Sequence, residues 1–565
     1  MEPRTLADIF FLSVAHDLER HVMIKRGAEW QVISSRQLYG YVSTMARIFK
    51  QWGLTKGDRV AILSENRPEW MIIDFACVTT GLVDVPIYAT LTAEQTLYVL
   101  ENSGARVVCV SSDEQLKKVQ SILSRTKIEK VVVMDDIAEI NVIPIWPLLN
   151  GSSFEQDAEW EAQAHTISPE DLATLIYTSG TTGNSKGVML THGNLTSNAN
   201  MSTRHAEWRP GDLYLSFLPL SHVTARHLDY VCYQNGVTVA YCPFFDQLPQ
   251  MLQEAKPTII VAVPRVYEKV RQEVERQAAG GVKRRIFNWA LRVGRRHKAE
   301  IERGDTPTSS AWKLADKLVY SKIRQGFGGR SRVYFSGGAP LGFDMSDWFC
   351  CMGIPVFEGY GLTETSPVAT ANKLDIKDYT GSIGMPLPST DIALRDDDGR
   401  IAPAGEAGEL CVRGPQVMKG YWNRPEETAK VMDADGWLRT GDIARMDGNG
   451  LFYIVDRKKD MILVSGFNVY PNEIEDVVAR HPGVLEVAAI GVPDEHSGEV
   501  VKLFVVKKDP SLTEEALKKF CHDELTGYKR PKYIEFRKEL PKSNVGKILR
   551  RELRDEEKKR EAKNV

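Results

Sequence analysis

Several features that mark large classes of protein are missing from this sequence of 565 residues. Its 72 Lys and Arg residues are balanced by 75 Asp and Glu residues, and a net charge of −3 gives no reason to expect a nucleic-acid partner. No stretch is long and apolar enough to cross a bilayer. The N-terminus has early acidic residues and only a short apolar run, which makes a poor signal peptide. We therefore expect a cytoplasmic protein.

Cysteine is scarce and shows no metal-binding pattern. The sequence has no CxxC pair and no other spacing typical of metal ligands. Most of the cysteines lie in apolar contexts, as buried free thiols do in reducing compartments, so this usage agrees with a cytoplasmic setting. The eight residues are Cys77, Cys109, Cys232, Cys242, Cys350, Cys351, Cys411 and Cys521.

The overall composition is that of an ordinary globular protein, with 43% hydrophobic and 26% charged residues. The chain is too long for one core, so we expect two or more domains. Its first half alternates short apolar strands with helical patterns, which is typical of βαβ units and a largely parallel sheet. The expected strands are 59–63, 83–88, 105–112 and 130–136, and the expected helices are 67–81 and 93–104.

Glycines follow several apolar runs. The runs at 258–264, 332–338 and 354–361 are interpreted as buried strands that end in turns. In open α/β sheets, ligands bind beyond the carboxyl ends of the strands. We therefore expect three glycine-rich turns to converge on one site, and these turns are residues 179–183, 336–338 and 359–361.

A change in composition near 456–460 indicates a second domain. Beyond it come two helical patterns and two apolar strands, in about a hundred residues, which is a normal size for a small domain. We expect a large domain over 1–455 and a small α+β domain over 456–565. The charged end of the chain, 555–565, is expected to be frayed and solvated.

The segment 271–330 is rich in Arg and Lys. Its basic residues alternate with apolar ones, which predicts a solvated helical hairpin that packs its apolar face on the body of the protein. The alternative is a helix that lies on a membrane surface. The apolar residues of the central stretch are Ile286, Phe287, Trp289, Leu291 and Val293.

Residues 177–187, YTSGTTGNSKG, hold three glycines, five Ser or Thr residues and one lysine directly after an apolar strand pattern. A flexible linker needs no lysine. A Walker loop needs Gly-Lys followed by Ser or Thr, whereas the order here is Ser185-Lys186-Gly187. Backbone N–H groups, hydroxyls and one ammonium suit a polyphosphate, so we interpret this stretch as a phosphate-binding loop.

Five stretches together resemble the AMP-forming adenylate enzyme superfamily, which includes acyl-CoA synthetases, peptide-synthetase adenylation domains and firefly-type luciferases. The resemblance runs from about residue 30 to 553 and implies an α/β fold. The expected N-terminal domain has mostly parallel sheets, helices and a β-barrel-like part, and a small mobile C-terminal domain follows. The stretches are 177–192, 358–365, 439–442, 456–466 and 541–553.

The resemblance implies that a carboxylate attacks the α-phosphate of ATP and that a thiol then displaces AMP. It assigns Mg²⁺ to Thr178 and Glu364, the α-phosphate to Thr363, and the first catalytic step to Lys547. Asp456 corresponds to a hinge, Gly466 to the channel for the CoA arm, and His222 to a ring near the carboxylate. The implied phosphate ligands are Thr178, Ser179, Gly180, Thr181, Thr182, Gly183 and Lys186. The implied nucleoside contacts are Gly337, Gly338, Ala339, Glu358, Gly359, Tyr360, Gly361, Asp442, Ile454 and Arg457.

The C-terminal third resembles bacterial long-chain fatty-acid–CoA ligases in particular. This likeness implies that ATP, Mg²⁺, CoA and a medium- to long-chain fatty acid react to give fatty acyl-CoA, AMP and pyrophosphate. Some long-chain relatives have an aromatic gate just after the histidine, where this chain has Arg226 and His227. Two alternatives stay open: an adenylating enzyme with an aryl acid or a carrier-protein acceptor, and a non-catalytic nucleotide-binding relative. A homodimer and peripheral membrane contact also stay open. The stretches are 456–478, 511–529 and 539–553, and residues 261–270 also resemble the long-chain branch.

Overall fold

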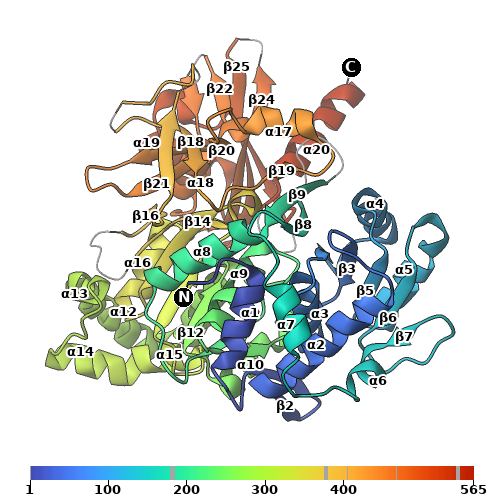
Figure 1. Ribbon diagram of the computed structural model, residues 1–565. Helices are drawn as coiled ribbons and strands as arrows, with labels where there is room; N and C mark the ends of the chain where they lie inside the picture. The colour runs from blue at the N-terminus through green and yellow to red at the C-terminus, as the bar shows by residue number, and fades with distance from the viewer. Residues whose placement is uncertain are drawn as a thin grey trace.

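The protein is described by a computed structural model (Figure 1). The α/β fold expected from the sequence is confirmed. The C-terminal elements lie at the top of Figure 1, the strands and helices of the first 150 residues at the lower right, and the basic helices at the lower left. The structure describes residues 2–178, 185–373, 379–396, 398–403, 405–465, 467–494, 496–542 and 548–564.

One sheet has eight strands in the order β19-β9-β8-β4-β3-β5-β6-β7. Its strands from β4 to β7 pair in parallel, whereas β8, β9 and β19 pair antiparallel to one another. The parallel strands are apolar and buried on both faces, which is typical when helices cover a sheet. The predicted βαβ units are therefore confirmed. The strands are β3 (Arg59–Leu63), β4 (Val83–Ile87), β5 (Val107–Val110), β6 (Lys130–Val133), β7 (Ile143–Pro144), β8 (Leu172–Thr178), β9 (Lys186–Thr191) and β19 (Gly420–Tyr421).

A second sheet has nine strands in the order β16-β15-β14-β13-β12-β10-β11-β1-β2. The expected turn at 359–361 is wrong, because β14 continues through Gly361 and pairs with β15. Glycine is needed at 361 for close approach, since a Cβ there would lie 1.7 Å from the Pro367 carbonyl oxygen. The strands are β1 (Val22–Arg26), β2 (Glu29–Ile33), β10 (Leu213–Ser216), β11 (Thr238–Tyr241), β12 (Ile259–Ala262), β13 (Val333–Ser336), β14 (Val356–Gly361), β15 (Val368–Ala371) and β16 (Met385–Pro386).

Helices of the first 240 residues share one continuous apolar core with both large sheets. Helices α1, α2, α3, α8 and α9 pack against one another, and α4 and α5 cover a second core around the parallel strands. This packing fixes the two sheets relative to each other. The helices are α1 (Leu6–Ala15), α2 (Ser35–Gln51), α3 (Pro68–Val78), α4 (Ala93–Ser103), α5 (Asp113–Gln120), α6 (Ile145–Leu149), α7 (Ala158–Ala164), α8 (His192–His205) and α9 (Val223–Gln234).

The basic segment forms more helices than the expected hairpin. Phe287 and Val293 of α12 are buried, which confirms that this helix packs its apolar face on the body. Among the described residues, no helix is long and apolar enough to cross a membrane. The elements of this region are α10 (Leu248–Ala255), α11 (Pro264–Gln277), α12 (Gly281–Arg296), α13 (Lys298–Glu302), α14 (Ser310–Ala315), the π-helical turn η3 (Asp316–Tyr320), α15 (Ser321–Gly326) and α16 (Phe343–Cys351).

A third sheet is formed by strands within residues 391–457. Its order is β17-β18-β20-β21 and all its neighbours are antiparallel. The part expected to resemble a barrel is thus an open four-stranded sheet. The elements are β17 (Asp391–Arg395), β18 (Gly408–Arg413), α17 (Pro425–Val431), β20 (Leu438–Met446) and β21 (Phe452–Arg457).

The C-terminal elements have hydrophobic clusters of their own. The expectation of a frayed tail is wrong, because α20 continues to Asn564. Buried Leu553 anchors it, and Glu557 and Arg560 pair with Lys502 (2.7 Å) and Glu535 (2.8 Å). The elements are β22 (Ile462–Val464), β23 (Phe467–Val469), α18 (Pro471–Val478), β24 (Val484–Asp494), β25 (Gly498–Lys507), α19 (Glu514–Glu524), β26 (Tyr533–Arg537) and α20 (Arg550–Asn564).

Candidate active site

The expected phosphate loop joins two paired strands. Thr178 ends β8 and Lys186 begins β9, and the two residues face each other in the antiparallel register. The Lys186 ammonium lies 2.5 Å from a carboxylate oxygen of Glu427 and 5.0 Å from the ring centroid of Tyr421. Hydrogen bonds from Lys186 and Lys430 lower the pKa of Glu427 to about 2. The remaining expected phosphate ligands, Ser179, Gly180, Thr181, Thr182 and Gly183, lie outside the described residues.

The predicted metal ligand Glu364 lies close to the same tyrosine. It belongs to the short 3₁₀-helix η4 (Thr363–Thr365), which follows β14. The Tyr421 hydroxyl donates a hydrogen bond of 2.8 Å to Glu364 Oε1. Burial raises the pKa of Tyr421 above its usual range, so the phenol keeps the proton that it donates. The fold therefore brings Lys186 and Glu364, which are distant in sequence, against one side chain. Thr363 directly precedes Glu364 in η4.

The expected nucleoside contacts meet where β13 and β14 run side by side. A Cβ on Gly337 would lie 3.4 Å from the Gly359 carbonyl oxygen, so these two strand ends approach closely. Gly338 turns the chain with φ +80° just before Ala339, as the sequence predicts. Burial raises the pKa of Glu358 to about 7, and one of its oxygens accepts from the backbone N–H of Leu341 (2.9 Å).

Asp442 connects this region to the third sheet. Tyr360 donates its hydroxyl hydrogen to Asp442 Oδ2 (2.6 Å), and Arg457 Nε lies 3.3 Å from Oδ1. Asp442 and Arg457 are direct partners between β20 and β21, and Ile454 lies on the same β21, opposite Ala444. The predicted nucleoside residues of two sheets thus form one connected group.

Asp456 lies in β21, and its carboxylate is fully buried. It accepts from the backbone N–H of Asn472 (2.7 Å), at the start of α18, and lies 3.3 Å from a guanidinium nitrogen of Arg550, at the start of α20. Burial raises the pKa of Asp456, and the Arg550 charge opposes that rise. The predicted Lys547 and Gly466 lie outside the described residues.

His222 caps the N-terminus of α9. Its Nδ1 accepts from the backbone N–H of Thr224 (3.1 Å), which leaves the ring proton on Nε2. Burial lowers the pKa of His222 to about 4, so the ring is neutral at physiological pH. Thr224, which fixes the ring, is itself one of the residues that line the cavity described next.

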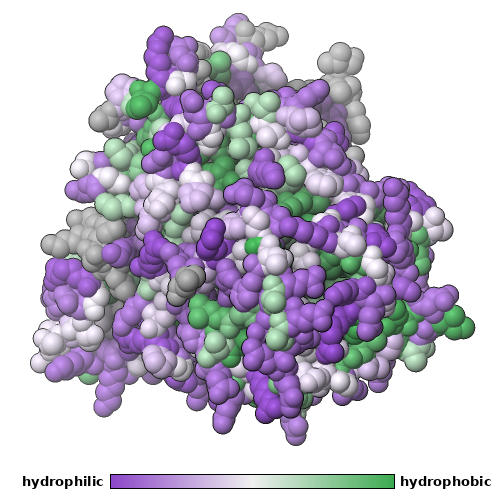
Figure 2. Space-filling view, in the orientation of Figure 1, coloured by the Kyte–Doolittle hydropathy of each residue, from purple (hydrophilic) through white to green (hydrophobic). Residues whose placement is uncertain are grey.

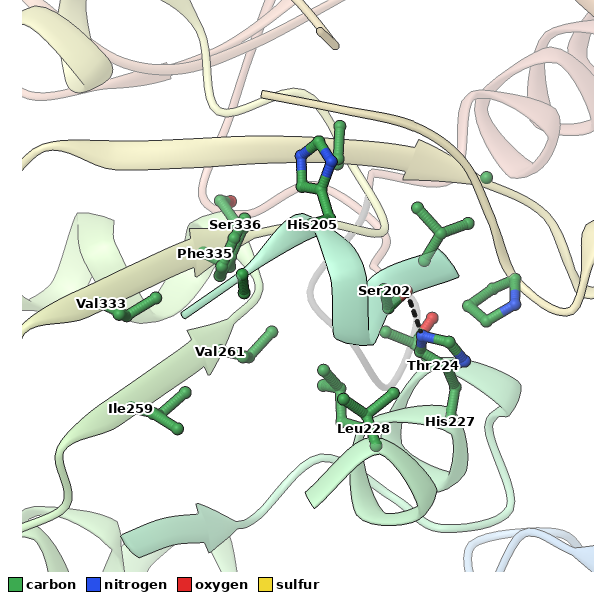
Figure 3. A pocket seen from close by; sticks show the side chains of 18 of the residues that line it. Ser202, His205, Thr224, His227, Leu228, Ile259, Val261, Val333, Phe335 and Ser336 are labelled. Carbon is green, nitrogen blue, oxygen red and sulfur yellow. Dashed lines mark hydrogen bonds between the residues drawn. The ribbon is translucent and has the colours of Figure 1, made fainter. Parts of the chain in front are cut away.

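An apolar cavity is lined in part by predicted nucleoside residues (Figure 3). In Figure 3, strands β12 and β13 supply Ile259, Val261, Val333 and Phe335 on one side, whereas α9 supplies Thr224, His227 and Leu228 on another. Five of the residues that line this cavity are predicted site residues: Gly337, Gly338, Gly359, Tyr360 and Gly361. The lining also includes Trp208, Tyr214, Val231, Cys232, Ile259 and Val333.

The two residues found in place of an aromatic gate have different surroundings. Arg226 is fully buried away from the cavity and pairs with Asp74 (2.5 Å) and Asp84 (2.9 Å), which join α9 to α3 and β4. His227 lines the cavity, and its Nε2 shares a hydrogen bond of 2.9 Å with the Ser202 hydroxyl (Figure 3). Burial lowers the pKa of His227 to about 3, so this part of the cavity carries no charge from the ring.

The model of the AMP-binding enzyme family matches residues 10–422, and that of its C-terminal domain matches residues 473–547. The chain belongs to the AMP-binding enzyme family. Similar curated members include the long-chain-fatty-acid–CoA ligases of Escherichia coli (38% identical, covering 98% of this chain and 94% of the relative) and Yersinia pestis (40%, covering 93% and 90%). Among solved structures, ATP-bound MatB from Rhodopseudomonas palustris matches with a TM-score of 0.81 at 27% identity, covering 98% of this chain and 99% of that one.

Sequence reasoning missed two groups of residues of this AMP-binding enzyme. The cavity-lining residues on β10, β12 and β13 belong to strands that look like ordinary core strands, so no sequence signal separates them. Tyr421 and Glu427 were also missed. Their stretch, GYWNRPEET (420–428), combines an aromatic pair with adjacent acids after an apolar strand pattern, and only the fold shows that it lies against Lys186 and Glu364.

Proposed function

We propose that this enzyme activates a medium- to long-chain fatty acid with ATP and transfers the acyl group to CoA. The products are fatty acyl-CoA, AMP and pyrophosphate. The observation that carries the proposal is the apolar cavity that Tyr360 and the neighbouring glycines help to line, because an alkyl chain buried there would have its carboxylate beside the nucleotide. Relatives named long-chain-fatty-acid–CoA ligase, 34% to 40% identical, support the same substrate class.

The first half-reaction joins the fatty acid to AMP. A carboxylate oxygen of the acid attacks the α-phosphorus, the bond to the β-phosphate bridging oxygen breaks, and pyrophosphate leaves with those electrons. Lys186 and the loop after β8 would bind the outer phosphates, and Thr363 the α-phosphate. Lys547 would stabilise charge on the pentacoordinate centre. Neutral His222 would present Nε2–H as a donor near the carboxylate.

The second half-reaction transfers the acyl group. The sulfur of CoA attacks the acyl carbon, the bond from that carbon to the phosphate oxygen breaks, and AMP leaves while the thiol proton passes to solvent. We assign the two half-reactions to two positions of a mobile domain, 456–565, that turns at Asp456 relative to 1–455. Support comes from the separate hydrophobic clusters of the C-terminal part and from the location of Asp456 where β21 meets α18 and α20.

The donors near the phosphate loop fit Mg²⁺. Magnesium on phosphates needs only one or two protein carboxylates. Glu364 offers one, and its Oε1 accepts the hydrogen bond from Tyr421. Thr178 would add a hydroxyl. The bound ion would neutralise negative charge on the phosphates. Within the described residues, no cluster of three or more His, Cys, Asp or Glu side chains competes as a metal site.

The deciding experiment measures acyl-CoA formation with ATP, Mg²⁺ and CoA across acetate, octanoate, palmitate, oleate, benzoate and amino acids. We expect a maximum among the longer fatty acids. Pyrophosphate release without a thioester would point to another acceptor, such as a carrier protein, and a maximum with benzoate would point to aryl acids. Absence of ATP consumption with every acid would contradict the enzyme assignment.

We also propose that the basic helices contact an anionic membrane surface, from which a long-chain acid could be supplied. Residues 281–330 contain 13 Lys and Arg against 4 Asp and Glu, in a chain whose net charge is −3. Exposed Val282, Leu314 and Leu318 accompany this charge, and Figure 2 shows a mostly hydrophilic surface where Figure 1 places α14. Nine exposed bases form no ion pair in the described part of the chain: Lys283, Arg284, Arg285, Arg292, Arg296, Lys313, Lys317, Lys322 and Arg330.

Co-sedimentation with vesicles tests this contact. Binding should require anionic lipid and weaken with salt, because exposed charges are screened. Reversal of charge in Arg284→Glu/Arg285→Glu should reduce binding, whereas Lys127→Glu/Lys130→Glu, which changes exposed bases elsewhere, should not. Equal binding to neutral and anionic vesicles, or equal loss in both double variants, would refute the assignment to this surface.

A further inference from the structure

Segment 418–428 is hydrogen-bonded to both parts of the predicted phosphate site, which are strand β9 and the short helix η4. Its backbone N–H groups donate to the carbonyl oxygens of Gly187 (2.8 Å) and Met189 (3.0 Å) on β9, and to that of Glu364 (2.9 Å) in η4. Because β9 begins at Lys186, one short stretch of chain is bonded both to the strand of the phosphate lysine and to the helix of the predicted metal ligand.

Tyr421, in the middle of this segment, contacts both functional side chains at once. Its hydroxyl donates to Glu364 Oε1 (2.8 Å), and its ring centroid lies 5.0 Å from the Lys186 ammonium. A phenol has one proton to donate, and the recipient is a defined oxygen of the carboxylate. A cation over an aromatic face is attracted to it, so the ring holds the ammonium without neutralising its charge.

The local sequence holds Tyr421 firmly in this position. Its backbone N–H donates to the Thr428 hydroxyl (2.9 Å), which closes the turn between β19 and α17. Gly420 has φ +137°, and a Cβ there would lie 2.9 Å from the Thr428 methyl carbon, so only glycine fits. Glu427, in the first turn of α17, lies 2.5 Å from the Lys186 ammonium. These contacts fix Tyr421 next to Lys186.

We propose that Tyr421 is a positioning residue for the nucleotide–metal site. Its hydroxyl holds the Glu364 carboxylate so that Oε2 faces a divalent cation on the phosphates, and its ring keeps Lys186 beside them. This inference rests on the proposed function only in taking ATP as the nucleotide, and it makes no assumption about the acyl substrate. Tyr421 would act through Glu364 and Lys186 rather than on the reacting atoms.

Calorimetric titration of ATP into the full-length protein, without any fatty acid, tests the proposal. The affinity for ATP is measured with Mg²⁺ and again with EDTA, in wild type and in Tyr421→Phe, which keeps the ring and removes only the hydroxyl. We expect the gain in affinity from Mg²⁺ to fall about ten-fold in the variant, the usual scale for a hydrogen bond to a charged group. Affinity in EDTA should stay unchanged, because the ring still contacts Lys186.

A matched control comes from Tyr39, whose hydroxyl makes an equivalent 2.8 Å hydrogen bond to Glu161 between α2 and α7. Tyr39→Phe should leave both affinities as in wild type. Thiolysis of preformed acyl-adenylate by CoA should also be unchanged in Tyr421→Phe, because that step uses neither the outer phosphates nor the ion. The proposal would be overturned if Mg²⁺ increased the ATP affinity of Tyr421→Phe as much as that of wild type. It would also be overturned if Tyr421→Phe and Tyr39→Phe lost this increase to the same extent. The titration contains no fatty acid. Its result can therefore be interpreted even if the acyl-CoA assay contradicts the proposed substrate.

Discussion

His222 illustrates how one backbone contact fixes the chemistry of a side chain. Because Thr224 N–H donates to Nδ1, the ring proton lies on Nε2, and burial lowers the pKa of His222 to about 4. In the unfolded chain the ring would bind a proton near its ordinary pKa of 6.5. Its contribution to stability is therefore complete above pH 6.5 and is lost as the pH falls toward 4.

We expect the stability of wild type to fall relative to that of His222→Gln as the pH is lowered from 6.5 toward 4. Urea denaturation of both proteins at several pH values would measure this difference. A difference that stays constant across the range would contradict the lowered pKa. The role of His222 near the carboxylate came from the resemblance, whereas its protonation state could come only from the fold, since a sequence does not reveal a cap.

At the scale of the element, helix α20 shows that a highly charged segment need not be disordered. Its last part, within 555–565, is almost wholly polar and was expected to be a frayed tail. Its stability comes from distant partners: Arg550 bonds to both carboxylate oxygens of Glu475 (2.9 and 2.6 Å) and lies 3.3 Å from Asp456. Such partners cannot be found by local pattern. Strands β3 to β6, in contrast, were predictable because each is a short apolar run closed by its own turn.

Arg550→Ala should destabilise the protein by about 3 kcal/mol, because it leaves the carboxylates of Glu475 and Asp456 buried without their cation. Arg551→Ala, one residue later on an exposed side of the same helix, is the control and should cost less than about 0.5 kcal/mol. Denaturant unfolding of the two variants would compare them. Equal losses in the free energy of unfolding would mean that the ion pairs of Arg550 stabilise the protein no more than an exposed arginine of the same helix does.

At the scale of the whole molecule, the site is made from segments that no single motif contains. The phosphate hairpin belongs to the eight-stranded sheet, Tyr360 and the glycines to the nine-stranded sheet, and Asp442 to the four-stranded sheet. The sequence predicted most of these pieces separately, since each has its own composition. The apolar cavity could not be predicted, because the residues that line it are of the same types as those of the buried core.

The proposed two positions of residues 456–565 predict that Lys547 acts in the first half-reaction only. Adenylation must stabilise charge as pyrophosphate leaves, whereas thiolysis displaces AMP from an activated carbonyl and needs no extra cation at the α-phosphate. Lys547→Ala should therefore reduce fatty-acid-dependent pyrophosphate release by about a thousand-fold, the scale for losing a group that stabilises transition-state charge. Conversion of synthetic acyl-adenylate and CoA into thioester should stay near the wild-type rate.

The neighbouring Lys542 provides a control for that comparison. Its ammonium lies 2.6 Å from Glu486, so Lys542→Ala removes a cation from the same segment without removing the proposed catalytic one. We expect this variant to retain both half-reactions. If Lys547→Ala slowed thiolysis as much as adenylation, the lysine would serve a shared structural purpose, and the assignment of the two half-reactions to two positions of residues 456–565 would lose its chemical basis.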